Sequence, residues 1–294
     1  MPDQPRSPRR RRPIDLTDPG TVAAVARRVG LRRDPGLGQH FLVDREVLEA
    51  IVAALGPDPS SEVLEIGCGL GTLTGALAET AGRVVAIDID PACVAGTGLT
   101  MRGRDNVSVV EADARTVDLT GFGFTAGWLA TGNLPYLITG IVLTRLLEAE
   151  LPPARAVFLV QREVAARLAA AAGDWSLATV AVRSLAEVER LRDIPPHAFD
   201  PPPAVHSSIV RLVPTAAFDA PTRAAVLAIA KPMFQARRKT LRNGLVRALG
   251  GDLSAASTAL SLAGIDSGRR PGTLRLDEWE RLAGAVAEVR ARMR

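Results

Sequence analysis

Short apolar segments alternate with helical segments over most of the chain, and this alternation limits the folds open to it. The segments between the apolar runs repeat apolar residues at helical spacing,. Short buried strands joined by helices form a mostly parallel sheet with helices on both faces. We therefore predict an α/β fold with a doubly wound, Rossmann-like sheet. The expected strands are 63-VLEI-66, 84-VVAID-88, 107-VSVVE-111, 127-GWLAT-131, 156-AVFLV-160 and 205-VHSSIVRLV-213.

The strand signals stop near residue 215, and only helical patterns follow,. This change predicts a main domain over residues 15–214 and a small, all-helical C-terminal domain over residues 215–294. Residues 1–14 are rich in Pro and Arg and have no apolar periodicity, so we predict a disordered basic tail there. The expected C-terminal helices cover residues 222–233, 236–249, 253–263 and 276–292.

Composition excludes several classes of protein. Apolar residues make up 47% of the chain, yet no uninterrupted apolar stretch of about 18 residues exists to span a bilayer,. The basic start lacks the apolar segment of a secretory signal, so we expect a cytoplasmic protein with no membrane partner. Cys68 and Cys93 have no CxxC or His cluster nearby, which predicts two free thiols and no metal site.

The cations are concentrated in a few places. The formal charge is only +4, and nearly all cations are arginines. They cluster at Arg9–Arg12, at Arg32 and Arg33, and in 237-RRKTLRN-243. Such clusters indicate a protein that meets phosphate backbones at more than one place.

A glycine-rich turn and two acids follow successive predicted strands. Gly67, Gly69 and Gly71 lie between a strand and a helix, where glycine permits a sharp turn and a close approach of ligand,. Asp88 ends the next strand and can accept both hydroxyls of a ribose. Asp113 follows a third strand and can accept from an adenine amine. Because ligands bind at the carboxyl ends of such strands, the set predicts a nucleoside-bearing cofactor.

The stretch 132-GNLPY-136 follows the fourth strand and holds the only tyrosine of the chain. The Asn133 side-chain oxygen and the Leu134 carbonyl can both accept hydrogens of an adenine amine and turn its lone pair towards an electrophile. Pro135 stiffens the turn. Tyr136 offers a flat face on which a base can stack. The pentapeptide therefore predicts the catalytic site.

Together these motifs resemble one known family from about residue 16 to the C-terminus. The chain is similar to the ribosomal RNA adenine N6,N6-dimethyltransferases that act on the small subunit. The motifs that carry the resemblance are, in order, 38-GQHFLVD-44, 64-LEIGCGLGTLT-74, 84-VVAIDID-90, 111-EADA-114, 132-GNLPY-136, 160-VQREVAARL-168, 199-FDPPPAVHSSIVRL-212 and 237-RRKTLRNGL-245.

The resemblance implies S-adenosylmethionine as methyl donor and a flipped adenine as acceptor. It implies a target of two adjacent adenines in the 3′-terminal hairpin of small-subunit rRNA, each methylated twice. The expected partner is that rRNA or the pre-30S particle, and the expected enzyme is monomeric and free of metal. The implied catalytic residues are Asn133, Leu134, Pro135, Tyr136 and Phe199, and the implied cofactor-binding residues are His40, Leu42, Gly67, Gly69, Asp88, Asp113 and Asn133.

Some positions depart from the family pattern. His40 stands where Asn is usual, Cys68 where Pro is usual, and Asp88 where Glu is usual. Each of these residues is still compatible with hydrogen bonding or a turn. The segment 173-GDWSLATV-180 differs more, since the family tends to show Tyr-Gly followed by Leu-Ser-Val.

Two related functions stay open at this point. Erm-type enzymes share the fold and methylate one adenine of large-subunit rRNA, giving macrolide resistance. Leu134, where they more often have Ile, and 237-RRKTLRN-243 favour the small subunit. An RNA-binding assembly factor without chemistry is the other alternative, and the intact Asn133, Pro135 and Tyr136 disfavour it. The G-x-G-x-G spacing disfavours a nicotinamide dehydrogenase.

Overall fold

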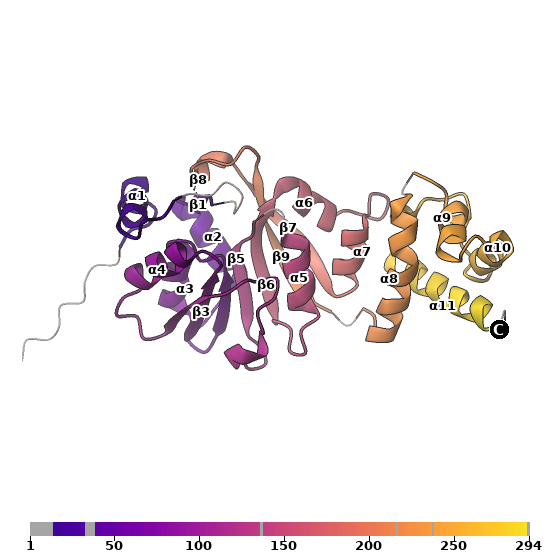
Figure 1. Ribbon diagram of the computed structural model, residues 1–294, viewed down its shortest axis with the longest axis horizontal. Helices are drawn as coiled ribbons and strands as arrows, with labels where there is room; N and C mark the ends of the chain where they lie inside the picture. The colour runs from indigo at the N-terminus through magenta and orange to yellow at the C-terminus, as the bar shows by residue number, and fades with distance from the viewer. Residues whose placement is uncertain (1–13, 33–38, 136–137, 216, 237, 293–294) are drawn as a thin grey trace, which may run out of the picture.

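The computed structural model describes residues 14–32, 39–135, 138–215, 217–236 and 238–292. Within these ranges, seven strands form one sheet in the order β4-β3-β2-β5-β6-β9-β7 (Figure 1). The five strands from β4 to β6 are parallel, and β9 runs antiparallel to both of its neighbours, β6 and β7. The predicted α/β sheet is confirmed. The strands of this sheet are β2 Glu62–Ile66, β3 Arg83–Asp88, β4 Val107–Glu111, β5 Leu129–Asn133, β6 Arg155–Gln161, β7 Ala186–Ile194 and β9 Ser207–Pro214.

Helices cover both faces of the sheet, as a doubly wound fold requires. Val63 and Val84 pack with side chains of α2 and α3 on one face. Leu64 and Val85, the next residue of each strand, pack with α5, α6 and α7 on the other face, because successive side chains of a strand point to opposite sides. The helices that precede β9 are α1 Pro19–Arg28, α2 Arg45–Leu55, α3 Thr72–Thr80, α4 Pro91–Thr100, α5 Thr139–Leu147, α6 Arg162–Leu168 and α7 Leu177–Arg183.

A two-stranded ladder joins two segments that are far apart in the sequence. β1 (Phe41–Leu42) pairs antiparallel with β8 (Phe199–Asp200), so that Leu42 lies opposite Phe199. The pairing brings the 39–44 segment beside the Pro-rich loop that follows β8.

Four helices pack at the end of the molecule farthest from α1 (Figure 1). Their core surrounds the buried Trp279 and includes Trp175 and Val180, which precede β7. The N–H groups of Gly173 and Trp175 both donate to the Gly272 carbonyl, so the divergent 173–180 segment joins these helices to the sheet. The domain boundary at residue 214 stays a prediction. The helices are α8 Ala220–Gln235, α9 Leu241–Ala248, α10 Leu253–Leu262 and α11 Leu276–Arg292.

Several elements differ from the sequence prediction, and the short elements β1, α7 and β8 were not predicted. Strand β7 was not predicted, because 186-AEVERLRDI-194 is an edge strand whose charged side chains face solvent. The helix expected from residue 236 begins at Leu241 instead. It is preceded by a turn in which the Lys239 N–H donates to the Ala236 carbonyl, and Thr240 caps the helix.

Gly132 permits the close approach of β5 to β2. Its φ is 154°, and a Cβ atom there would lie 2.1 Å from the Ile66 carbonyl oxygen. We expect Gly132→Ala to lower the free energy of unfolding by about 2–4 kcal/mol, because neither backbone can move without breaking the ladder. Urea unfolding measures this change.

The control for this experiment is Gly140→Ala. Gly140 is exposed in α5 with nothing within 4 Å of its Cβ position, so we expect no loss of stability and a gain of at most about 1 kcal/mol, because alanine favours a helix over glycine. Equal effects of the two substitutions would contradict the packing constraint.

Candidate active site

The glycine loop lies between β2 and α3, where the sequence predicted it. Gly67, Gly69 and Gly71 have φ angles of 78°, 56° and 97°, which L side chains rarely adopt. A Cβ atom on Gly69 would lie 3.0 Å from the Phe41 ring. Glycine therefore allows the loop to turn sharply while lying directly against β1.

Asp88 holds this loop from the end of β3. Its Oδ2 accepts a hydrogen bond from the Gly69 N–H at 2.9 Å, and its Oδ1 accepts one from the Asp90 N–H at 3.0 Å. Burial raises the pKa of the Asp88 carboxyl above its ordinary value,. With one described donor on each oxygen, both oxygens keep a further acceptor position, as binding of two hydroxyl groups requires.

Ile89 is a residue that the sequence analysis did not single out. It follows Asp88 directly and is 45% exposed. An exposed apolar side chain beside a hydroxyl-binding carboxylate offers a surface for a flat ring. The sequence could have identified Ile89 by its position, because it is an apolar residue directly after the acid that ends a strand.

Asp113 follows β4, at the same edge of the sheet as Asp88. Its carboxylate accepts hydrogen bonds from the backbone N–H and the guanidinium of Arg115. These hydrogen bonds hold the pKa of Asp113 below its ordinary value,. The predicted acceptor for an adenine amine is therefore ionised and already engaged by its neighbour.

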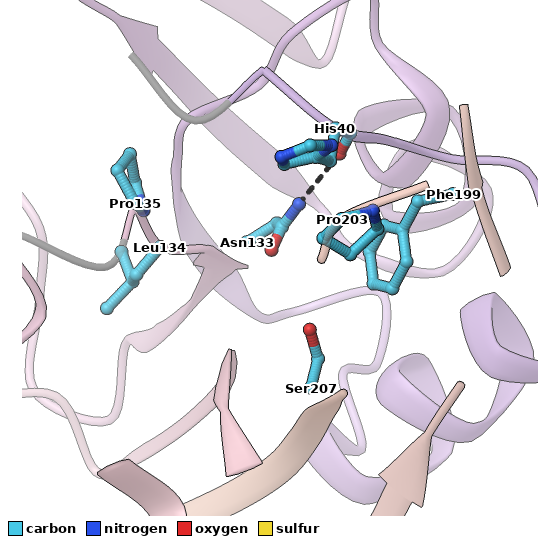
Figure 2. Close-up of a pocket in the computed structure, with 7 residues that line it drawn as sticks. All are labelled: His40, Asn133, Leu134, Pro135, Phe199, Pro203 and Ser207. Carbon is cyan, nitrogen blue, oxygen red and sulfur yellow. Dashed lines mark hydrogen bonds between the residues drawn. The ribbon is translucent and has the colours of Figure 1, made fainter. Parts of the chain in front are cut away.

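Asn133 ends β5 and points into a pocket (Figure 2). Its Nδ2 donates to the His40 carbonyl at 3.0 Å, which fixes the orientation of the amide. No described residue donates to its Oδ1, and this oxygen faces the pocket in Figure 2. The amide is thus oriented so that its acceptor, not its donor, is available to a ligand.

His40 is itself held by the Pro-rich loop. Its Nδ1 lies 2.7 Å from the Pro201 carbonyl oxygen. A carbonyl can only accept, so Nδ1 carries a proton and donates. His40 therefore accepts a hydrogen bond from Asn133 with its backbone carbonyl and donates one to the Pro-rich loop with its ring. These two bonds hold the ends of β1, β5 and β8 around one pocket.

The structure brings most of the predicted catalytic residues together. Leu134, Pro135 and Phe199 line the pocket with His40 and Asn133 (Figure 2). Pro203 and Ser207 also line it and were missed as individual residues, although both lie in the 199–212 motif. Tyr136 lies outside the described residues, as does Gly38. Leu42 does not line the pocket, because its side chain is buried in the core beneath α2.

A buried acid and two buried thiols lie in and near the glycine loop. Glu65 is 1% exposed, and its Oε2 accepts a 2.5 Å hydrogen bond from the Thr74 hydroxyl. Burial, with the nearby Asp88, raises the pKa of Glu65 to about 8. Burial also raises the pKa of the Cys68 and Cys93 thiols. Both cysteines are free, as predicted.

The described part of the predicted basic run, residues 238–243, covers the turn before α9 and the first turn of that helix, and none of these residues lines the pocket. The Leu241 and Arg242 N–H groups donate to the Arg269 and Ser267 carbonyls, which brings a second loop alongside. Arg237 lies outside the described residues, as do Arg9–Arg12 and Arg33. The exposed cations that this arrangement gathers are Arg238, Lys239, Arg242 and Arg270.

Among the described residues, no group of three or more His, Cys, Asp or Glu side chains is placed to hold a metal ion. In the same part of the chain, no helix is both long and apolar enough to cross a membrane.

The fold and this site define a Rossmann-like methyltransferase. The crystal structure of the 23S rRNA methyltransferase ErmE matches with a TM-score of 0.67 and 28% identity, covering 84% of this chain and 99% of that chain. A dimethyladenosine transferase from Plasmodium falciparum matches with a TM-score of 0.69 and 26% identity, covering 83% and 96%. Each match spans most of both chains.

Sequence comparison gives the family. The family model described as "Ribosomal RNA adenine dimethylase" matches residues 31–286. A protein of Dehalococcoides mccartyi named ribosomal RNA small subunit methyltransferase A is 36% identical over 255 residues, which are 86% of this chain and 88% of that protein. The chain belongs to the ribosomal RNA adenine dimethylase family, as its motifs predicted.

Glu65 should make stability depend on pH. Its pKa of about 8 in the folded protein exceeds its ordinary value of 4.5. Between these values the unfolded chain binds fewer protons at this residue than the folded protein, so stability falls as pH rises from about 4.5 to 8. We expect a contribution approaching about 1.4 kcal/mol per pH unit in that window, which Glu65→Gln removes. Urea unfolding at four pH values measures it.

The control for this experiment is Glu111→Gln, at an exposed glutamate that ends β4. This variant shows how much the pH dependence of stability changes when any single glutamate is replaced by glutamine. A constant difference between the unmodified chain and Glu65→Gln from pH 4.5 to 8 would contradict the linkage.

Proposed function

We propose that this protein transfers methyl groups from S-adenosylmethionine to N6 of two adjacent adenines in the 3′-terminal hairpin of small-subunit rRNA. The observation that carries the proposal is the orientation of Asn133. Its Nδ2 is bound to the His40 carbonyl and its Oδ1 faces the pocket. An acceptor held in this way selects a group that donates, such as an adenine amine, and orients it before reaction.

The cofactor fits the residues present at the carboxyl edge of the sheet. Asp88 offers acceptors for two ribose hydroxyls, and the exposed Ile89 offers an apolar surface for a base. The glycines let the loop turn tightly against Phe41 and Thr100, where a Cβ atom would be crowded. S-adenosylmethionine, when bound, supplies an electrophilic methyl group on a sulfonium. The roles of these residues towards it are part of the proposal.

The catalytic role falls to hydrogen-bond acceptors. The Leu134 N–H donates to the Leu159 carbonyl at 3.0 Å, which fixes the peptide that follows Asn133 against β6. We infer that the Leu134 carbonyl and the Asn133 Oδ1 each accept one hydrogen of the amine. The amine nitrogen then moves towards tetrahedral geometry, and its lone pair becomes available for attack. Orientation and partial charge supply the rate enhancement, so no side-chain base is required.

Phe199 supports recognition of the base. It is buried, and it lines the pocket on the side of the Pro-rich loop, opposite β5 (Figure 2). A flipped base entering between β5 and this loop would meet its ring, and stacking of this kind contributes about 1–3 kcal/mol per base. We propose Tyr136 for the other face of the base.

The small subunit is the better-supported target. The relative in Dehalococcoides mccartyi that is 36% identical carries a small-subunit name, and the 23S rRNA methyltransferase structure is 28% identical. A relative in Anaeromyxobacter dehalogenans with the same small-subunit name is 38% identical over 280 residues. We propose that the enzyme binds this rRNA within the pre-30S particle.

Asn133→Ala tests the mechanism. We expect methyl transfer to fall by at least about a hundredfold, because the amine loses one of its two acceptors. The measurement is transfer of labelled methyl from S-adenosylmethionine to small subunits from a strain that lacks the modification, with nucleotide mapping of the 3′ hairpin. Binding of S-adenosylhomocysteine should be weakened but measurable, which controls for folding.

Three outcomes would count against the proposal. Full activity of Asn133→Ala would refute the positioning of the amine. Label in large subunits only would favour the Erm-type alternative. Binding of rRNA by the unmodified chain with no transfer under any condition would favour the assembly-factor alternative.

Arg242 tests the proposed contact of the α9 region with RNA. It is exposed, as are Lys239 and Arg270 in the adjoining turn and loop. We expect Arg242→Ala to weaken binding of small subunits and to reduce the slope of log K against log salt by about 1, because one phosphate contact is lost. Filter binding at several salt concentrations measures the slope.

The matched control for Arg242 is Arg281→Ala, since Arg281 lies on α11 in an ion pair with Asp277. This substitution removes one cation of the same kind from a different helix. An equal loss of small-subunit binding in both variants would contradict a specific contact between Arg242 and RNA.

A further inference from the structure

The carboxylate proposed to read the cofactor's adenine is covered by an arginine two residues away. Arg115 donates its backbone N–H to Asp113 Oδ1 at 2.8 Å. Its Nε lies 3.0 Å from both carboxylate oxygens, and its Nη2 lies 2.7 Å from Oδ2. The guanidinium therefore binds the carboxylate in the bidentate manner typical of Arg and Asp.

These contacts occupy the acceptor positions that an adenine amine needs. A carboxylate has about four lone-pair positions, and three N–H groups of Arg115 already lie within 3.0 Å of Asp113, with the Nε–H shared between its two oxygens. An incoming amine can bind Asp113 strongly only if the guanidinium moves away. The backbone N–H of Arg115 does not have to move, because it is part of the turn in which Thr116 and Val117 donate to the Asp113 carbonyl.

Displacement of the guanidinium is feasible. The Arg115 side chain is 48% exposed and Asp113 is 23% exposed, and pairs in contact with water contribute little to stability. Asp113 does not lose its charge when the guanidinium leaves. A second cation, Arg145, lies near it and favours the ionised form. Arg145 is tied to the Val117 carbonyl by a 2.8 Å hydrogen bond.

We propose that the Arg115 guanidinium occupies the adenine-amine position of Asp113 and must be displaced by the cofactor, so that Arg115 sets cofactor affinity and adenine selectivity. This inference rests on the proposed use of S-adenosylmethionine. S-adenosylmethionine and its product S-adenosylhomocysteine carry the same adenine, so Arg115 promotes release of both. Dimethylation of two adenines consumes four donor molecules, and each turnover requires one product to leave. By binding Asp113 again as S-adenosylhomocysteine leaves, Arg115 shortens the time for which the product occupies the cofactor site.

The test measures binding without reaction. Isothermal titration with S-adenosylhomocysteine compares the unmodified chain with Arg115→Ala. Removal of the competitor should tighten binding about two- to fivefold. The difference in affinity between Arg115→Ala and the unmodified chain should shrink as salt is raised, because salt screens the exposed Arg115–Asp113 pair. Arg104→Ala is the matched control: Arg104 forms an exposed ion pair with Glu79 beyond α4, and its loss should leave binding unchanged.

A second ligand isolates the amine. S-inosylhomocysteine carries a carbonyl where S-adenosylhomocysteine carries the amine, so it is repelled by Asp113 and can accept from Arg115. The preference for the adenine ligand should therefore be larger in Arg115→Ala than in the unmodified chain. Equal or weaker binding of S-adenosylhomocysteine by Arg115→Ala, with no gain in preference, would overturn the role of Arg115 and leave the proposed cofactor intact. No binding of either ligand by the unmodified chain would overturn both.

Discussion

The close approach of β5 to β2 at Gly132 is the constraint on which the rest of the site depends. A side chain at this position would collide with the Ile66 carbonyl, so glycine lets the two strands end side by side. The strands place the glycine loop and Asn133 next to each other, and a Cβ on Gly67 would lie 3.2 Å from the Asn133 carbonyl oxygen. In the proposed mechanism the methyl donor and the methyl acceptor would thus bind at adjacent strand ends, as transfer between them requires.

Hydrogen bonds from distant segments then fix the polar groups at these strand ends. Asp88 holds the Gly69 and Asp90 N–H groups, and the His40 carbonyl holds the Asn133 amide. In each case one part of a side chain is used for structure and another is left for a ligand. Asp113 differs, because its partner is an exposed guanidinium that a ligand can replace. The proposed site therefore combines two acceptors held by the backbone, Asp88 and Asn133, with one acceptor, Asp113, that an exposed arginine covers.

Much of the fold could be predicted from the sequence because the central strands are buried on both faces. Residues such as Val63–Ile66 read as nearly continuous apolar runs, and the glycines and acids that end them mark the binding edge. Strand β7 could not be predicted in this way. It lies at the edge of the sheet, and its alternation of apolar and charged residues resembles a surface segment. The start of α9 was misplaced because the helical pattern continues across the turn at Ala236–Thr240.

The sequence by itself determined the family, the strands that carry the site, and the choice of Gly67, Asp88, Asp113 and Asn133 as candidate site residues. These follow from local patterns, since each residue ends a strand or forms a turn. Only the tertiary structure decided which atoms of these residues are available. The Asn133 amide is oriented by a carbonyl 93 positions away in the chain, and Leu42 is drawn into the core by α2. Which atoms a ligand can reach depends on contacts with residues that are distant in the sequence. The spacing of motifs along the chain does not encode these contacts.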